Sequence, residues 1–289
     1  MEAASSEHPR GAEAVGRRIE TTGGVTHVLA NMLGATLRPG WHADALREGD
    51  VLPTLWHWVA FPQDTPMEAI GPDGHPALGA FLPDLGLGRR MWAGGTLSFL
   101  QPLHVGEPLT KRSEITAVDW KQAGSGPLAI VSLAHVIEGA NGPAIEESQQ
   151  IVYLPIPDSY RPPKPIPAPD GAAFEETVAI DAVRLFRYSA ATFNGHRIHY
   201  DRPYATQVEH YPGLIVHGPL QATLLIERAV RHRGGTPPIR LTHRGVHPMF
   251  DHQPLRLLGL DEGQTMKLCT ATRQEDGGHQ GMQVKAEWA

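Results

Sequence analysis

The sequence predicts an α+β protein made of two halves, in which antiparallel sheets each wrap around a central helix. Seven prolines fall between Leu154 and Phe174, where neither an interior strand nor an interior helix fits. Strand-like segments follow one another on both sides of this stretch. The predicted helix Leu220–His232 is apolar around much of its circumference, which indicates that other structure, most simply a curved sheet, encloses it.

The proline-rich stretch is expected to connect two domains. A polyproline segment rises about 3.1 Å per residue, so about fifteen residues span on the order of 45 Å, the length of a small domain. We therefore expect four segments along the chain: a flexible tail (1–18), a first domain (19–154), a linker (155–173) and a second domain (174–289).

The first half is predicted to begin with a helix and to continue as strands. Within Gly24–Leu37, the apolar residues Val25, Leu29, Met32 and Leu33 recur at helical spacing. Aromatic or alternating apolar residues, separated by glycine-containing breaks, indicate the strands that follow. These strands are Val51–Phe61, Ala93–Phe99, Pro108–Lys121, Leu128–Ile137 and Glu147–Leu154.

The second half is predicted to carry two helices before its strands. Asp181 is placed to cap a helix over Ala182–Thr192, because an aspartate side chain accepts hydrogen bonds from the first N–H groups of a helix. Val183, Phe186 and Ala190 lie on one face of that helix. After the apolar helix, strands are expected over Ile239–His247, Gln264–Arg273 and Gly281–Trp288.

Composition excludes several classes of function. The 289 residues include 25 Lys and Arg against 31 Asp and Glu, a net charge of −6 that disfavours general binding to nucleic acid. The single cysteine, Cys269, excludes an intramolecular disulfide framework and a cysteine-based zinc cluster. Residues 1–18 lack the apolar stretch of a secretory signal, and no apolar run reaches the roughly 18 residues of a membrane span. We therefore expect a cytoplasmic protein without nucleic-acid or membrane partners.

Sixteen histidines raise the question of proton transfer or metal binding, since imidazole titrates near neutral pH. The densest group of polar side chains lies in Asn194–Asp201 (NGHRIHYD), directly after a predicted helix, and His217 and Gly218 precede the next helix. Loops held by rigid elements commonly carry such functional groups.

A metal site is not expected among these histidines. His243 and His247 would stand about 13 Å apart on a strand, too far to share one zinc ion. His196 and His199 would suit one metal only on a helix, which Gly195 and the nearby prolines disfavour.

The polar segment resembles a known family of enzymes. Phe193–Asp201, followed by Gly213–Gly218 and a helix, is similar to the MaoC-like (R)-specific enoyl-CoA hydratases, whose pattern is close to G-D-x-N-P-[LIV]-H. The segments Trp56–Pro76 and Arg89–Gly95 resemble mesaconyl-C4-CoA (3-methylfumaryl-CoA) and itaconyl-CoA hydratases. The resemblance covers about residues 20–288 and implies a double hotdog fold, with a non-catalytic first hotdog and a catalytic second one.

The resemblance also implies a reaction and its residues. The reaction is the reversible hydration of an α,β-unsaturated acyl-CoA, here a branched C5 dicarboxylyl-CoA (mesaconyl-C4-CoA or itaconyl-CoA) converted to citramalyl-CoA, without metal or redox cofactor. His199 falls on the family histidine and is the expected acid/base. Asn194 falls on the family aspartate, and an amide can orient water but cannot act as a base. The N–H of Gly218, at the start of a helix, is placed to polarise the thioester carbonyl.

Three residues close to His199 and Gly218 in the sequence are candidates for supporting roles in catalysis, and each also has a purely structural interpretation. His196, which together with Arg197 replaces the family's Asn-Pro pair, is either part of the site or a loop side chain bonded to backbone. His217 either takes part or packs so as to position Gly218. Asp201 either orients an imidazole or caps the following turn.

Four arginines are candidates for binding the free carboxylate of the substrate or the phosphates of coenzyme A, because a guanidinium binds such groups in a bidentate manner. The simpler alternative is an ordinary solvated pair. These residues are Arg89, Arg90, Arg197 and Arg202.

Other functions are compatible with the same residues. A 3-hydroxyacyl thioester dehydratase of fatty acyl chains, on CoA or an acyl carrier, would have little need of the arginines. A non-catalytic acyl-CoA-binding module would follow if Asn194 abolished turnover, and a hotdog thioesterase would release free thiol. A homodimer is compatible with the sequence.

Overall fold

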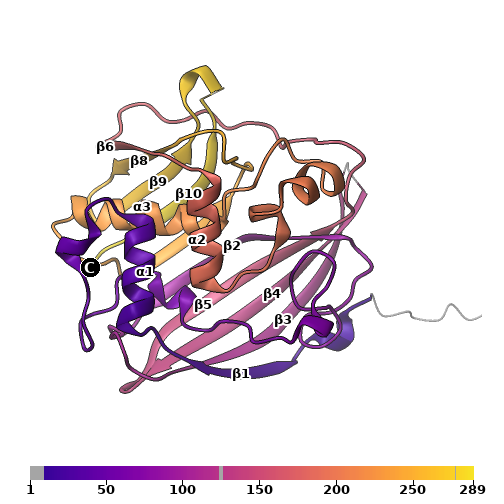
Figure 1. Ribbon diagram of the computed structural model, residues 1–289, viewed down its shortest axis with the longest axis horizontal. Coiled ribbons are helices and arrows are strands. Elements are labelled where there is room, and N and C mark those ends of the chain that lie inside the picture. The colour runs from indigo at the N-terminus through magenta and orange to yellow at the C-terminus, as the bar shows by residue number, and fades with distance from the viewer. Residues whose placement is uncertain (1–9, 124–125, 277) are drawn as a thin grey trace, which may run out of the picture.

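The computed structural model describes residues 10–123, 126–276 and 278–289, and its named strands form one antiparallel sheet (Figure 1). The first half supplies β1 (Arg18–Gly23), β2 (Arg89–Phe99), β3 (Leu109–Ala123), β4 (Gly126–Gly139) and β5 (Gly142–Leu154). The second half supplies β6 (Phe174–Val178), β7 (Arg240–Gly245), β8 (Leu255–Asp261), β9 (Thr265–Ala271) and β10 (Gln280–Glu287).

The two halves share one topology. The sheet order is β1-β3-β4-β5-β2-β7-β10-β9-β8-β6, so each half runs first, third, fourth, fifth, second strand from its edge to the middle. There β2 and β7 pair antiparallel, with Gly95 opposite His243 and Leu97 opposite Leu241. This arrangement confirms the α+β class. Because one sheet runs through both halves, the division into two separate domains stays a prediction.

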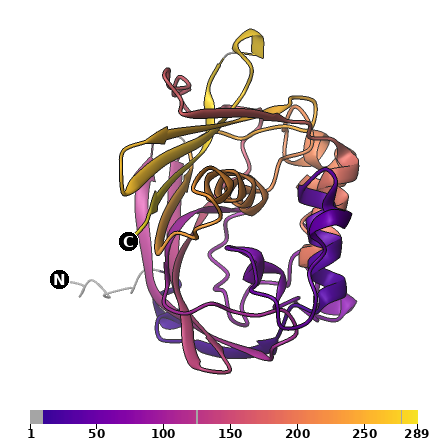
Figure 2. The same ribbon diagram turned by 90° about the vertical axis from the view of Figure 1, so that its left-hand side faces the viewer.

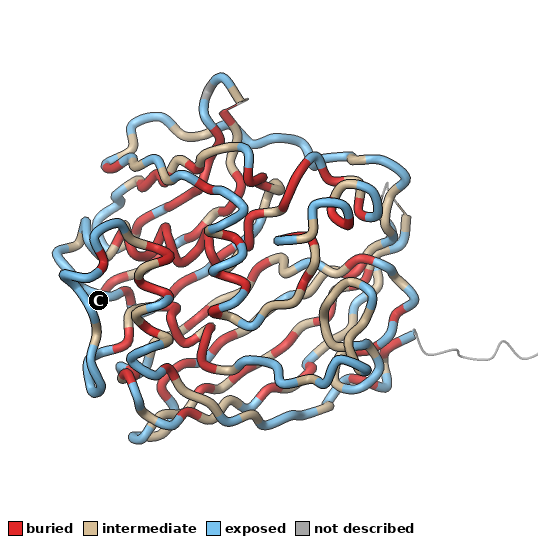
Figure 3. Tube along the Cα trace, viewed as in Figure 1, coloured by how far each residue is buried: buried red, intermediate tan, exposed pale blue. Residues whose placement is uncertain are grey.

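The helices lie on the inner face of the curved sheet. α3 (Gly218–His232) contacts β8, β9 and β10 and is enclosed by the curve of the sheet, while α1 (His27–Leu37) and α2 (Ala182–Thr192) pack side by side next to it (Figure 2). Buried residues concentrate on α3 and on the strands around it (Figure 3). Leu220 and Leu225 of α3 are fully buried, and burying a leucine contributes about 1.5–3 kcal/mol. The helix α3 is apolar around much of its circumference because the sheet and the neighbouring helices cover it on most sides.

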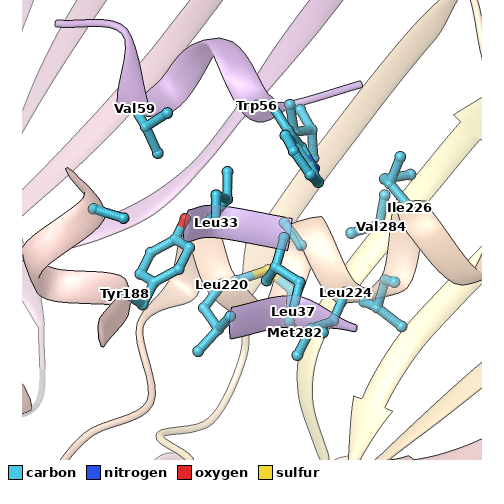
Figure 4. Packing of buried hydrophobic residues seen from close by; sticks show 14 of the residues in the cluster. Leu33, Leu37, Trp56, Val59, Tyr188, Leu220, Leu224, Ile226, Met282 and Val284 are labelled. Carbon is cyan, nitrogen blue, oxygen red and sulfur yellow. The ribbon is translucent and has the colours of Figure 1, made fainter. Parts of the chain in front are cut away.

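Side chains from both halves share the core. Leu33 and Leu37 of α1, Tyr188 of α2, Leu220 of α3 and Trp56 of the first half converge in one cluster (Figure 4). The two halves are therefore joined by apolar packing as well as by the sheet.

The predicted strand Val51–Phe61 is wrong. Leu55 adopts a left-handed backbone with φ of 72°, and Trp56–Val59 form a 3₁₀ helix. Trp56 is fully buried, and its Nε1 donates to Glu227 Oε1 of α3 at 2.8 Å. The aromatic pattern in this segment thus reflects long-range packing against α3, which local strand propensity does not represent.

The bounds of α2 match the prediction, but its buried face does not. Asp181 caps the helix by accepting a hydrogen bond from the Arg184 N–H at 2.8 Å, as expected. The expected apolar face is exposed: Val183 and Phe186 are 65% and 62% exposed, and Ala190 is exposed too. The buried residues are instead Leu185, Tyr188, Ser189 and Ala191. A polar contact made by Ser189, described below, helps to turn this face inward.

The proline-rich linker and the N-terminal tail, which both lie outside the sheet, differ in their contacts with the rest of the chain. Residues 155–173 form neither helix nor strand and make one isolated bridge, between Pro167 and His279. Residues 1–9 of the predicted tail lie outside the described residues. The rest of the tail is packed, since Ala14 is fully buried and Trp120 Nε1 donates to Arg10 O at 2.8 Å. Among the described residues, no helix is both long and apolar enough to span a membrane.

Candidate active site

His199 lies at the end of a short 3₁₀ turn, Arg197–His199, between α2 and α3. Its Nδ1 is 2.8 Å from the carbonyl oxygen of Ile215. Because a carbonyl only accepts, Nδ1 carries the proton and Nε2 keeps its lone pair. The imidazole is 7% exposed, and burial lowers its pKa to about 4. His199 is therefore a neutral imidazole at neutral pH, with a nitrogen able to accept a proton.

His199 belongs to a row of four imidazoles. Its ring stacks on His217 with centroids 3.6 Å apart and meets the edge of His196 at 5.4 Å. His196 in turn contacts His75, with centroids 4.1 Å apart. Burial also lowers the pKa of His196 and of His217 well below the usual value. The structure thus brings three predicted histidines together and adds a fourth.

The inner end of the row is anchored on α2. His217 Nε2 lies 2.9 Å from Ser189 Oγ, and within the described part of the chain its Nδ1 has no hydrogen-bond partner. The ring of His217, held by Ser189, therefore packs against one face of the His199 ring and restricts its orientation.

Asn194 shapes the turn that carries these rings. Its side-chain Oδ1 accepts a hydrogen bond from the His196 N–H at 3.0 Å, and its backbone N–H donates to Ser189 O at 2.8 Å. The preceding residue, Phe193, ends α2 in a left-handed conformation with φ of 50°. The predicted role of Asn194 in orienting water stays a prediction.

Gly218 is the first residue of α3, so its N–H has no acceptor within the helix. Pro219 follows and lacks an N–H altogether. A Cβ at Gly218 would lie 2.6 Å from Cε3 of Trp92, so a glycine is required for the ring of Trp92 to approach the helix. An unpaired N–H at a helix N-terminus, where the helix dipole is positive, suits a developing oxyanion.

The first half contributes two residues that the sequence interpretation did not include, Asp73 and His75. His75 Nδ1 lies 3.0 Å from Asp73 Oδ2. The loop that carries them contacts the predicted catalytic segment, since Arg197 N donates to Asp73 O at 2.9 Å. A Cβ at Gly74 would overlap the carbonyl oxygen of Gly195. The only sequence signal was that this loop lies in the segment Trp56–Pro76 that carries the resemblance.

The four candidate arginines already have carboxylate partners. Arg89 is buried and donates to Glu209 Oε2 at 2.6 Å, and Arg90 donates to Asp73 Oδ2 at 3.1 Å. The remaining pairs are Arg197 with Asp201, at 2.7 Å, and Arg202 with Asp251. A substrate carboxylate or phosphate would have to share a guanidinium with these acids, so the binding role of the arginines stays a prediction.

Asp201 makes the contacts of a turn cap. Its Oδ1 accepts from the Tyr204 N–H at 3.1 Å, and its Oδ2 accepts from Arg197. These bonds lower the pKa of Asp201. They correspond to the capping alternative.

One group has the spacing of metal ligands: ligand atoms of Asp73, His75 and His196 lie within 4.8 Å of one another. However, both carboxylate oxygens of Asp73 also face Arg90, at 3.1 and 3.4 Å. A bound cation would have to share this carboxylate with a permanently charged guanidinium, which disfavours a metal by charge repulsion.

A double hotdog with a buried histidine beside the N-terminus of its central helix defines the MaoC-like class of thioester hydratases and dehydratases. The chain belongs to the hydroxyacyl-thioester dehydratase type 2 family, whose model matches residues 55–251. It is therefore a hydro-lyase.

Individual relatives agree with this assignment. A mesaconyl-C(4)-CoA hydratase of Chloroflexus aurantiacus is 40% identical, over 88% of this chain and 90% of that protein. The mitochondrial hydroxyacyl-thioester dehydratase type 2 of Schizosaccharomyces pombe is 29% identical, over 70% and 75%.

Solved structures confirm the fold. A MaoC-like dehydratase from Phytophthora capsici has a TM-score of 0.70 at 14% identity, covering 95% of this chain and 96% of that one. A Mycobacterium tuberculosis protein described as a double hotdog has a TM-score of 0.56 at 12% identity, covering 94% and 95%. The expected double hotdog is thus confirmed.

Proposed function

We propose that the protein catalyses the reversible hydration of an α,β-unsaturated acyl-CoA thioester. The substrate of the proposal is a branched C5 dicarboxylyl-CoA, mesaconyl-C4-CoA or itaconyl-CoA, and the product is citramalyl-CoA. The observation that carries the reaction type is the buried His199, whose tautomer Ile215 fixes and whose ring stacks on His217, the residue directly before Gly218 at the start of α3. The 40% identity to a mesaconyl-C(4)-CoA hydratase supports the acyl group.

The chemistry assigns a role to each group. The water oxygen bonds to Cβ while one water proton passes to Nε2 of His199, and the π electrons of the double bond move to the thioester oxygen. The N–H of Gly218 donates to that oxygen, and a proton then adds at Cα. General acid–base catalysis contributes about 10²–10⁴ in rate, and one oxyanion donor contributes about 10²–10³.

In this proposal no redox cofactor is needed, because addition of water changes no oxidation state overall. No metal takes part either, because Arg90 occupies the carboxylate of Asp73 in the one described group with metal-ligand spacing. Dialysis of the enzyme against a chelator should leave its rate unchanged. A loss of activity that zinc restores would contradict this part of the proposal.

One observation favours a second candidate, a 3-hydroxyacyl thioester dehydratase of neutral fatty acyl chains. All four candidate arginines are paired with acids, which leaves the free carboxylate of a C5 substrate without an obvious partner among them. The S. pombe relative carries that dehydratase name.

A panel of three thioesters separates the candidates: mesaconyl-C4-CoA, itaconyl-CoA and crotonyl-CoA, each followed by chromatographic separation of the unsaturated thioester from its hydroxyacyl product. The proposal predicts fast hydration of a C5 substrate and slow hydration of crotonyl-CoA. Preference for crotonyl-CoA and longer chains would favour the dehydratase, and release of free thiol would indicate a thioesterase. Tight binding of all three without turnover would indicate a non-catalytic module. The cytoplasmic location and a homodimer stay predictions.

A further inference from the structure

Hydration of a double bond moves two protons, one away from the attacking water and one to Cα. Residue 194 is an asparagine, whose amide does not titrate, so of the pair His199 and Asn194 only His199 can carry a proton. The inference below rests on the proposed function and concerns the source of the second proton.

We propose that His75, positioned by Asp73, is the second acid/base group of this active site. Both residues come from the first half of the chain, for which the family resemblance implies a non-catalytic hotdog. His75 is the catalytic residue of this pair and Asp73 the positioning residue.

The contacts of Asp73 fix the tautomer of His75. The carboxylate accepts from the ring Nδ1 at 3.0 Å and from the His75 backbone N–H at 3.1 Å. An ionised carboxylate only accepts, so Nδ1 carries a proton and Nε2 is the nitrogen left for chemistry. A carboxylate behind an imidazole stabilises the imidazolium, as in the triad arrangement of hydrolases. His199 has only the carbonyl of Ile215 in that position.

The loop is fixed against the catalytic segment by backbone contacts. Arg197 donates through its backbone N–H to Asp73 O at 2.9 Å and through its Nη1 to Pro72 O at 3.0 Å. Gly74 and Gly195 lie too close for a Cβ on either. The Asp73–His75 pair is therefore held in one position relative to His199.

His196 connects the two acid/base groups. Its ring centroid lies 4.1 Å from that of His75 and 5.4 Å from that of His199. The His75 side chain is 26% exposed, whereas His199 is 7% exposed. His75 therefore lies at the more exposed end of the imidazole row, and His199 at a buried position in it.

The proposed step conserves protons and electrons. His199 Nε2 takes a proton from water as the O–Cβ bond forms, and the π electrons reach the thioester oxygen. The enolate electrons then form the Cα–H bond with the proton on Nε2 of the His75 imidazolium. His199 then releases its proton to solvent and His75 takes one proton from solvent, so water has added and both rings return to their starting protonation states.

The charges facing His75 predict the effect of removing Asp73. Burial lowers the pKa of His75 and the Arg90 guanidinium lowers it further, whereas the hydrogen bond and charge of Asp73 oppose this shift. His75 in turn lowers the pKa of the neighbouring imidazoles His196 and His199. Without the carboxylate the imidazolium is less stable. Because His75 acts as an acid, the high-pH limb of the kcat profile should move to lower pH.

The test compares His75→Gln, Asp73→Asn and a matched control. His247→Gln is the control, because the His247 ring contacts His279 at the same 4.1 Å centroid distance but outside the imidazole row. We expect His75→Gln to lower kcat by about 10²–10⁴ with KM changed only a few-fold. Asp73→Asn should shift the high-pH limb downward, and His247→Gln should leave kcat and the profile unchanged.

Two further measurements keep the test decisive if His75→Gln folds poorly. His75→Ala should regain part of its activity when imidazole is added to the assay. In D₂O, the same variant should incorporate deuterium at Cα of the product thioester much more slowly than the wild-type enzyme.

Failure of the inference is distinct from failure of the proposed function. A wild-type enzyme that hydrates none of the three enoyl-CoA thioesters overturns the proposed function. A wild-type enzyme that hydrates them, with His199→Ala inactive and folded His75→Gln fully active, overturns only the role of His75. Loss of wild-type activity on chelation, restored by zinc, also overturns it, because Asp73, His75 and His196 would then act as metal ligands.

Discussion

The imidazole rings of His199 and His217 stack with centroids 3.6 Å apart and planes 19° apart. His199 is bonded to the carbonyl of Ile215, and His217 is bonded to the hydroxyl of Ser189. Two hydrogen bonds and one stacking contact therefore fix the orientation of the proposed acid/base. A free imidazole would sample several rotamers, and the loss of that freedom is part of how the fold prepares the site.

The first prediction concerns the Ser189–His217 bond. Ser189→Ala removes the hydroxyl and leaves a buried imidazole nitrogen unpaired, which should cost about 1–3 kcal/mol in free energy of unfolding. It should also lower kcat, because His217 no longer holds the ring of His199. Ser113→Ala is a matched control, since Ser113 Oγ lies 2.7 Å from Nδ1 of the buried His135, in the first half. Urea unfolding should show similar losses for both variants, and equal kcat values in both would contradict the role of Ser189.

The second prediction concerns the space at Gly218. A Cβ there would meet the ring of Trp92 at 2.6 Å, so Gly218→Ala should lower the free energy of unfolding by about 1–3 kcal/mol and reduce kcat. Gly245→Ala is the control, because its nearest neighbour, Ala93 O, lies at an ordinary 3.7 Å. Thermal unfolding and hydration assays check both variants. A Gly218→Ala enzyme with wild-type stability would contradict the close approach of the Trp92 ring to the start of α3.

The third prediction concerns a partly buried ion pair between the halves, Arg38 with Glu227. Glu227 of α3 accepts from Trp56 Nε1 at 2.8 Å and from Arg38 at 2.9 and 3.1 Å. Glu227→Ala should cost about 1–3 kcal/mol, because it leaves the buried Trp56 N–H without a partner and removes the acceptor of the partly exposed Arg38. The bidentate pair of Arg256 with Glu175 is the surface counterpart, with the Glu175 side chain 48% exposed. Glu175→Ala should cost at most about 1 kcal/mol, and urea unfolding that gave equal losses would contradict this account.

The fourth prediction concerns pH. Burial lowers the pKa of His135, His199 and His243 to about 4, so between pH 6.5 and 4 these groups are protonated when unfolded and neutral when folded. The unfolded state then binds more protons, and the free energy of unfolding should fall as pH drops through this range and stay level above it. Urea unfolding at pH 5 and pH 7.5 measures the difference. Equal stability at the two pH values would show that these histidines are not buried neutral.

The fold was predictable from the sequence where local signals decide structure. Asp181 marks the start of α2, and the Gly139–Gly142 break marks the turn between β4 and β5. Two expectations failed because tertiary packing decided them. The Trp56 segment is a 3₁₀ helix because Trp56 bonds Glu227 of α3, and the polar Ser189 faces inward because it bonds His217.

The site was predictable only within one continuous segment. His196, His199 and His217 come together as the motif suggested, with Gly218 at the start of α3. Asp73 and His75 lie more than one hundred residues earlier, and no spacing rule links them to that segment. Their place depends on the contact of the Gly74 loop with Gly195, which only the closed double hotdog creates.

The most direct test of the central claim is the initial rate of mesaconyl-C4-CoA hydration by the wild-type protein and by His199→Ala. The account predicts that the wild-type protein consumes the enoyl thioester. It also predicts that His199→Ala is slower by at least about a hundredfold, with an unchanged circular dichroism spectrum. A folded His199→Ala protein with wild-type turnover would contradict the claim that His199 is the acid/base of this site.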